Sequence, residues 1–170
     1  MPQPKRVGSL EIGQDIDFQR KEWRAQRVGW VVMALIALAA LAGLMGNGVL
    51  ARATAGDATD PIRLEYARFD RMQSPSSLQV EIAGEAVAGE QVELLVDREY
   101  LQGVQIEKVV PEPEAVRGAA DDLVYVFAVD EPGQPLTVSF DLRHNDFGAK
   151  SGRVALSDGP TLEFGQLVYP

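Results

Sequence analysis

Few side chains in this sequence have the types and spacing that chemistry requires. His144 is the only histidine. Its polar neighbours are Asp141, Arg143, Asn145 and Asp146. An imidazole beside carboxylates can move protons or bind a metal, but one histidine supplies neither a hydrolase triad nor a zinc ligand set. We therefore expect His144 to be a solvated residue at the end of a strand.

Two acidic pairs, Asp121-Asp122 and Asp130-Glu131, could supply the oxygen ligands that calcium prefers. The sequence pattern of a calcium-binding loop is absent, so we expect solvated turn residues. The chain has no cysteine, which excludes disulfides, thiolate metal sites and cysteine nucleophiles. Phosphate-binding glycine loops, serine elbows and paired-histidine motifs do not occur. The sequence therefore predicts no catalytic residue, no cofactor and no metal.

Three arginines, Arg63, Arg68 and Arg71, lie close together in an otherwise acidic region. They could contact lipid phosphates or an acidic partner. The alternative is weak surface ion pairing with Glu65 and Asp70. Arg63 and Arg68 fall on opposite faces of a regular strand, which argues against a single patch.

The stretch from Val28 to Ala51 determines where these side chains are placed. Its 24 residues carry no charge, and Asn47 is their only strongly polar side chain. As a helix they would extend about 36 Å, enough to cross the roughly 30 Å hydrocarbon core of a bilayer. We predict a single transmembrane helix.

A cleaved signal peptide is the alternative. Ala51-Arg52-Ala53 and Ala53-Thr54-Ala55 both have the small-x-small form of a cleavage site. The 27-residue leader and the long apolar run exceed the usual dimensions of a signal peptide, so we favour an uncleaved anchor.

Charge sets the expected orientation. The predicted membrane-interface residues are Arg20, Lys21, Arg24, Arg27 and Trp30. The positive-inside rule then places the N-terminus in the cytoplasm and the C-terminal part outside the cytoplasmic (inner) membrane. The net charge is −9, and residues 52–170 carry ten Lys/Arg against twenty-one Asp/Glu. So acidic a domain argues against nucleic-acid binding.

We predict four parts: a cytoplasmic leader (1–27), the transmembrane helix (28–51), a flexible linker (52–61) and an extracytoplasmic β domain (62–170). The first ten residues are expected to be disordered, and one helix could begin near residue 14 and continue through the membrane. Small residues four apart would let a second helix approach, either from another membrane protein or from a second copy of the chain. These pairs are Ala39 with Gly43 and Ala42 with Gly46.

From residue 62 onward apolar and polar residues alternate, which is typical of half-buried strands. About eight strands are predicted: 62–69, 78–82, 92–97, 104–107, 123–129, 136–142, 154–156 and one beginning at 162. Turn residues separate them, so we predict a mainly β chain with an antiparallel sandwich, immunoglobulin-like or similar. Residues 112–122 are expected to be a loop or one helical turn.

Three short motifs add a resemblance: Arg27-Val28-Gly29-Trp30, Leu64 to Phe69, and Val168-Tyr169-Pro170. With these motifs the chain resembles a family of small, uncharacterised bacterial single-pass membrane proteins, and this implies no activity. In outline it is also similar to accessory proteins such as oxidase-assembly factors. The copper-carrying kind needs cysteines, which are absent here.

We therefore expect a non-enzymatic accessory or protein-interaction module that is anchored in the lipid bilayer and meets another membrane protein at the outer face of the membrane. The alternative is a carrier that holds an apolar or lipid ligand between its sheets. That carrier would need a cavity lined by residues such as Phe127, Phe140 and Phe164.

Overall fold

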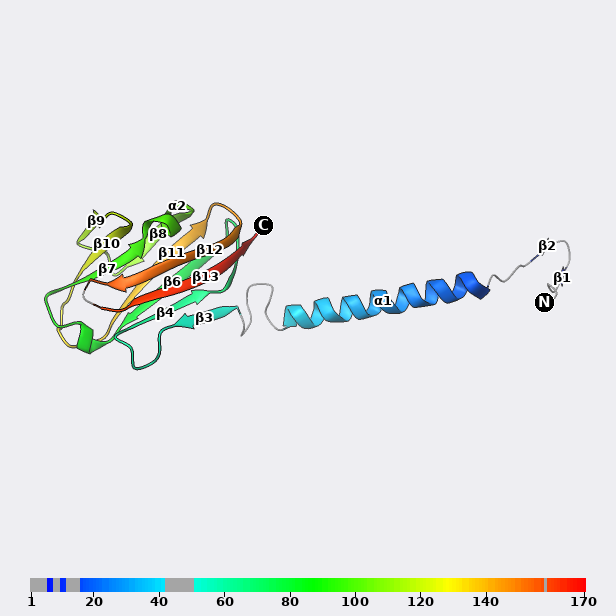
Figure 1. The fold of residues 1–170 in the computed structure, drawn as a ribbon, viewed down its shortest axis with the longest axis horizontal. Coiled ribbons are helices and arrows are strands. Elements are labelled where there is room, and N and C mark those ends of the chain that lie inside the picture. Colours follow the sequence, from blue (N-terminus) through cyan, green and yellow to red (C-terminus); the bar gives the residue numbers. More distant parts are fainter. Residues whose placement is uncertain (1–5, 8–9, 12–15, 42–50, 158) are drawn as a thin grey trace. The chain divides into compact units, whose positions relative to one another are not determined.

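The chain is described from a computed structural model, which divides it into two compact units, Met1–Leu41 and Ala42–Pro170 (Figure 1). The structure describes residues 6–7, 10–11, 16–41, 51–157 and 159–170. In the first unit β1 (Arg6–Val7) pairs antiparallel with β2 (Leu10–Glu11). The expected disorder of the first ten residues is therefore wrong for these short strands.

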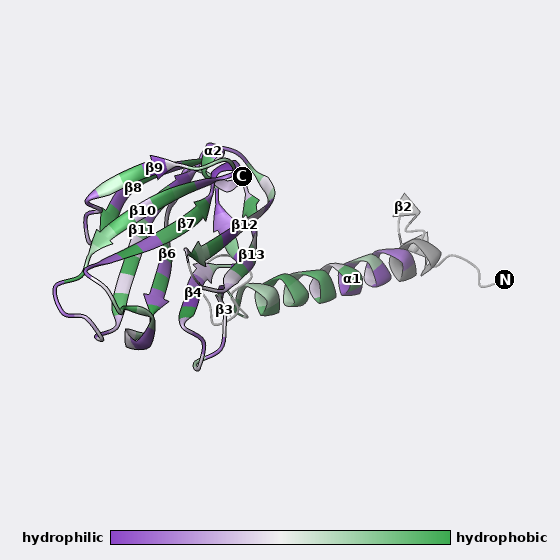
Figure 2. Cartoon of the chain, turned by 60° about the vertical axis from the view of Figure 1, so that its left-hand side comes forward, coloured by the Kyte–Doolittle hydropathy of each residue, from purple (hydrophilic) through white to green (hydrophobic). Residues whose placement is uncertain are grey.

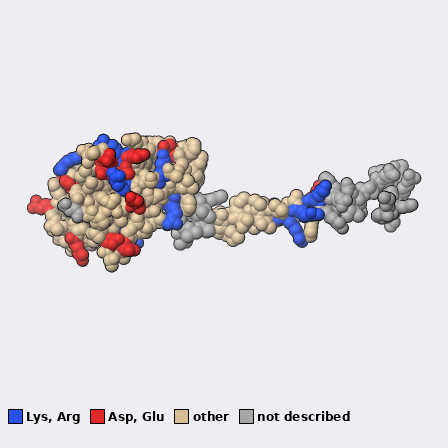
Figure 3. All heavy atoms as spheres, in the orientation of Figure 1, with Lys and Arg blue, Asp and Glu red and all other residues tan. Residues whose placement is uncertain are grey.

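Helix α1 (Ile16–Leu41) follows, and its start agrees with the helix expected from about residue 14. Its segment Lys21–Leu41 has a mean hydropathy of 1.4 and is not buried within the structure. Those 21 residues extend about 31 Å, so α1 is a candidate for a membrane span or a signal anchor. Figure 2 shows apolar colouring over the C-terminal part of the helix, and Figure 3 shows Lys and Arg side chains gathered toward its N-terminal half.

The second unit is a mainly β domain of two sheets, as predicted. The six-stranded sheet has the order β5-β13-β12-β7-β10-β9, and the five-stranded sheet has the order β3-β4-β6-β11-β8. Every strand pair is antiparallel except β5 with β13, which is parallel. The strands are β3 (Arg52–Ala55), β4 (Ile62–Ala67), β5 (Phe69–Arg71), β6 (Pro75–Ile82), β7 (Gln91–Asp97), β8 (Val104–Val110), β9 (Ala115–Gly118), β10 (Asp122–Ala128), β11 (Leu136–His144), β12 (Gly148–Leu156) and β13 (Thr161–Tyr169). A 3₁₀ turn (Gly84–Ala86) and helix α2 (Arg98–Gln102) complete it.

Several predicted boundaries differ from the structure. Residues 52–55, assigned to a flexible linker, form β3 and pair with β4. Ala51, assigned to the membrane helix, is only 2% exposed and belongs to the β domain. Residues 115–118, assigned to a loop or helical turn, form edge strand β9. Each of these segments takes its conformation from backbone hydrogen bonds to another segment of the domain. A local hydropathy pattern does not reveal such pairing.

The core lies between the two sheets. Alternate residues along each strand are buried, for example Val138, Phe140 and Leu142 on β11. Aromatic contacts join the sheets: the Tyr125 and Phe140 rings lie 5.1 Å apart, edge to face. This arrangement fixes which side chains of β5, β11 and β13 point inward, and these form the site described next.

Candidate functional site

A polar pair spans the two sheets at one end of the domain. Asp70 is the central residue of β5, in the six-stranded sheet, and its side chain points inward. His144 ends β11, in the five-stranded sheet, and it is completely buried. The Nε2 atom of His144 lies 3.3 Å from Oδ2 of Asp70. The expectation that His144 is solvated is therefore wrong.

The position of His144 in its strand explains this burial. Its number has the same parity as the buried residues Val138, Phe140 and Leu142, so the alternation of β11 turns its imidazole toward the core. Sequence parity could thus have identified its burial. Asp70 gave no such signal, because it lies on a three-residue strand whose pairing with β13 is a long-range contact.

Opposing effects act on the Asp70 carboxyl. Burial raises its pKa, while His144, Ser76 and the Arg71 backbone lower it more, so its pKa lies below the ordinary value of 3.8. The Arg71 N–H donates to Oδ1 over 2.8 Å. Oδ2 and both ring nitrogens of His144 have no well-aligned hydrogen bond among the described residues. The contacts with His144, Ser76 and the Arg71 backbone therefore favour the ionised carboxyl of Asp70, and the coulombic effect of His144 is the smallest of these contributions.

A second buried polar contact lies alongside. Tyr100 of α2 donates to Oε1 of Gln166 over 2.7 Å, and Nε2 of Gln166 donates to the Ala67 carbonyl over 2.8 Å. Burial and the charge of Asp70 raise the pKa of the Tyr100 phenol, which therefore stays protonated and acts as a donor. The Tyr100 ring lies 6.2 Å from His144, edge to face.

Ser76, Asp70 and His144 are the residue types of a hydrolytic triad, but their order is different. In a triad the imidazole lies between the nucleophile and the carboxylate. Here both Ser76 and His144 act on Asp70, so the carboxylate is in the middle and the imidazole is buried. This arrangement cannot activate the serine in the usual way. Within the described part of the chain, no three His, Cys, Asp or Glu side chains group as metal ligands.

A polar hollow of about 360 Å³ opens on the surface beside Asp70. Its lining includes Ala51, Arg52, Asp70, Arg71 and Ser76. Arg52 pairs with Glu65 at its rim over 3.1 Å. The hollow therefore combines guanidinium groups with a buried carboxylate and a hydroxyl.

The pH dependence of folding tests the state of Asp70. Because the pKa of the folded carboxyl is depressed, ionised Asp70 stabilises the fold above about pH 4, and this contribution is lost as the pH falls through the folded pKa. We expect the unfolding free energy of the full chain in detergent, measured with urea, to fall between about pH 5 and pH 2. Asp70→Asn should make that fall shallower. Glu81→Gln, which removes a surface carboxylate paired with Arg63, is the control; an unchanged slope in Asp70→Asn contradicts this view.

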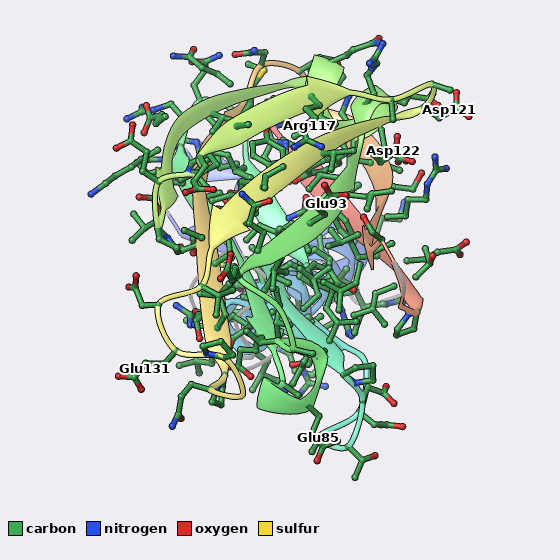
Figure 4. The ribbon with its side chains drawn as sticks, turned by 90° about the vertical axis from the view of Figure 1, so that its left-hand side faces the viewer. Glu85, Glu93, Arg117, Asp121, Asp122 and Glu131 are labelled. Carbon is green, nitrogen blue, oxygen red and sulfur yellow. The ribbon has the colours of Figure 1, made fainter. Side chains whose placement is uncertain are left out.

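The other predicted site residues are dispersed. Asp121 and Asp122 lie at the start of β10, whereas Asp130 and Glu131 follow its other end, and Figure 4 shows Asp121 and Glu131 far apart. They cannot share one calcium ion. Arg63 pairs with Glu81 over 3.6 Å, rather than with the expected Glu65 or Asp70.

The remaining predicted residues are those expected at the membrane interface or at a contact with a second helix. Lys21, Arg24, Arg27 and Trp30 are exposed on α1, and the Arg27 guanidinium lies 3.6 Å from the centre of the Trp23 ring. Ala39 is also on α1. The side chain of Arg20 and residues Ala42, Gly43 and Gly46 lie outside the described residues. Their predicted roles stay predictions.

No protein-family model matches the sequence, and no curated protein matches it. Among solved structures, a cohesin module from the family 33 glycoside hydrolase of Clostridium perfringens ATCC13124 matches with a TM-score of 0.44 and 10% identity, covering 64% of this chain and 96% of its own. The PmoD soluble domain of Methylocystis sp. ATCC 49242 (Rockwell) has a TM-score of 0.38 and 15% identity, covering 68% and 97%. A β-glucosidase from Listeria innocua has a TM-score of 0.36 and 14% identity, covering 68% and 17%. At these TM-scores none assigns a family or a function, and the family resemblance stays a prediction.

Proposed function

We propose that the chain is a membrane-anchored, non-enzymatic interaction module that presents its β domain at the outer face of the cytoplasmic membrane. The exposed apolar helix α1 supports the anchor. Its basic residues precede its apolar part, which supports a cytoplasmic N-terminus by the positive-inside rule. The partner we propose is an extracytoplasmic segment of another membrane protein.

The position of β3 supports an anchor that is not cleaved. Cleavage after Ala53 or Ala55 would remove half or all of the strand that pairs with β4. It would also remove Ala51, whose carbonyl accepts a hydrogen bond from the Arg68 backbone over 2.6 Å. A processed chain would lose these contacts and expose the edge of β4.

The observation that carries the interaction proposal is a pair of open sheet edges. β8 ends the five-stranded sheet and β9 ends the six-stranded sheet, and four residues connect them. Val110 on β8 is 43% exposed and Val116 on β9 is 51% exposed. Backbone groups at such edges can pair with an added strand, and exposed valines add apolar contact.

The buried pair favours a non-enzymatic role, because its imidazole is enclosed and its carboxylate lies in the middle. The ligand-carrier alternative has less support. Phe140 packs edge to face on Tyr125, and Phe127 stacks beside the same ring. Neither phenylalanine lines any of three hollows found on the described part of the domain, and both act as core residues. Phe164 does line a hollow, of about 420 Å³, which opens beside the charged residues Asp97, Arg153 and Glu163.

Photo-crosslinking tests the open edges. A photoreactive residue at Val116, in the full chain in its native membrane, should form one discrete adduct with a membrane protein. The same residue at Glu131, in the loop after β10, is the matched control and should form none (Figure 4). A chain that shows no adduct at Val116, or equal adducts at both positions, contradicts an interface at β8 and β9.

A further inference from the structure

The two open edges of the domain differ in how readily they can accept another strand. β8 contains a bulge at Glu107, because its register with β11 shifts between Lys108 and Ile106. It also carries the exposed Lys108. Bulges and lysines on an edge strand both hinder the addition of another strand. β9 has a regular register with β10 and contains no bulge, lysine or proline, so it is the more open of the two edges.

The free backbone groups of β9 belong to Val116 and Gly118. Ala119 donates to the carbonyl of Asp122, the residue directly opposite, over 2.9 Å. Facing residues of an antiparallel ladder alternate between hydrogen-bonded and non-bonded pairs, so Arg117 also bonds to β10. The N–H and C=O groups of Val116 and Gly118 therefore point away from β10, toward the open edge.

Val116 and Gly118 also share the inner face of β9. They oppose Tyr125 and Leu123 of β10, and the Tyr125 side chain is buried in the core. Val116 is nevertheless 51% exposed, because β9 is the last strand of its sheet. An aliphatic side chain from an added strand would cover it.

The guanidinium of Arg98 lies behind Gly118. Arg98 begins α2, which packs against both β8 and β10. Its Nη2 atom donates to the Ala119 carbonyl over 2.7 Å. The Cβ of any side chain at position 118 would lie only 2.9 Å from Nη2, so the glycine leaves room for the guanidinium on the inner face of β9.

This guanidinium has no acidic partner. Among the described residues, no carboxylate is within ion-pair distance of Arg98, and its buried Nε atom has no hydrogen bond. Asp97 caps α2 and Asp122 pairs with Arg153. Asp121 is exposed, and Figure 4 shows it at the tip of the β9–β10 hairpin. Because buried polar groups are normally satisfied, the guanidinium indicates an acceptor supplied from outside the chain.

We propose that β9 accepts an extended antiparallel segment of the partner, in which an acidic residue lies two positions before an aliphatic one. This inference rests on the interaction module proposed above and names the chemistry of its partner. The segment pairs with the free backbone groups of β9, and its aliphatic side chain covers Val116. Its carboxylate lies beside Gly118 and meets the part of the Arg98 guanidinium that Ala119 does not engage. The residue between the two turns to the outer face.

A peptide titration of the full chain in detergent tests this edge. The probes are acetyl-TTETVTT-amide and its glutamine counterpart acetyl-TTQTVTT-amide, at physiological ionic strength, which screens the acidic surface beyond about 8 Å. The NMR shift of the Gly118 amide, observed with isotope-labelled glycine, reports binding. The acidic peptide should bind about fivefold more tightly than the glutamine peptide. This comparison uses the unsubstituted chain, so it does not depend on a variant that folds.

Substitutions then locate the binding. Arg98→Gln should reduce the difference between the two peptides to within about twofold. Arg153→Gln, which removes a surface charge paired with Asp122, is the control and should preserve the difference. Val116→Lys should weaken the acidic peptide about fivefold or more, whereas Val110→Lys adds the same charge on β8 and should change it less than about twofold.

Three results would overturn the proposal: an unchanged Gly118 amide, equal affinity of the two peptides for the unsubstituted chain, or equal weakening by Val116→Lys and Val110→Lys. The titration contains no partner protein, so its failure does not contradict the interaction module itself. A discrete crosslink at Val116 with a failed titration would show a partner that meets β9 without adding a strand.

Discussion

His144→Ala should destabilise the β domain by about 3–5 kcal/mol. The variant removes the imidazole that lies 3.3 Å from Asp70 and leaves the buried carboxylate without this polar partner. It also leaves a cavity between the sheets, because His144 is fully buried. Urea unfolding of the full chain at pH 7, followed by near-ultraviolet circular dichroism, measures the loss.

A double variant separates the charge effect from the cavity. Asp70→Asn/His144→Ala removes the isolated charge but keeps the cavity, so it should recover part of the stability lost in His144→Ala. If the double variant is less stable than His144→Ala by the full cost of Asp70→Asn alone, the two residues do not interact. That additivity would contradict the electrostatic pairing described here.

Leu35→Lys/Leu38→Lys should abolish stable membrane insertion of α1. Each lysine near the middle of a membrane helix costs about 2.5–3.5 kcal/mol, and these positions, three apart, lie on one helix face. We expect the variant to be released by carbonate washing of membranes, whereas the unsubstituted chain remains in the pellet. Both leucines are exposed in the structure, so the substitution disturbs no internal packing.

Glu22→Lys is the matched control because it also adds a positive charge to α1, at the end that already carries Lys21 and Arg24. It should leave insertion unchanged, since the positive-inside rule favours basic residues there. The mass of the mature chain adds an independent check. An unsubstituted chain that carbonate releases intact, or that has lost about its first 53–55 residues, contradicts a permanent anchor.

Hydropathy alternation predicted the two-sheet domain because the side-chain period of a strand is local information. Residues 136–142 and 92–97 were found for this reason, and the structure extends the first to His144. β3 and β9 were missed because Arg52–Ala55 and Ala115–Gly118 are short and rich in small residues. Their strand conformation comes from pairing with β4 and β10.

The site was less predictable than the fold. Asp70, His144, Tyr100 and Gln166 come from four elements separated by long stretches of sequence, and only sheet packing brings them together. Asp141 and Asp146 were considered as partners of His144 because they lie close to it in the sequence. Asp141 instead alternates away from the buried face of β11. Composition also could not show which arginines lack partners, since that depends on where each acid lies.

The order of the five-stranded sheet has a mechanical consequence. β3, the first strand after the helix, and β8, one of the two strands proposed as the interface, are its opposite edges. Four strand-to-strand steps of about 4.8 Å separate them. The sheet therefore holds β3, the strand nearest the helix in sequence, about 19 Å from β8. Tension between an immobile tether and a molecule held at β8 would cross every backbone ladder of this sheet in series. The weakest ladder would then set the force that the domain withstands.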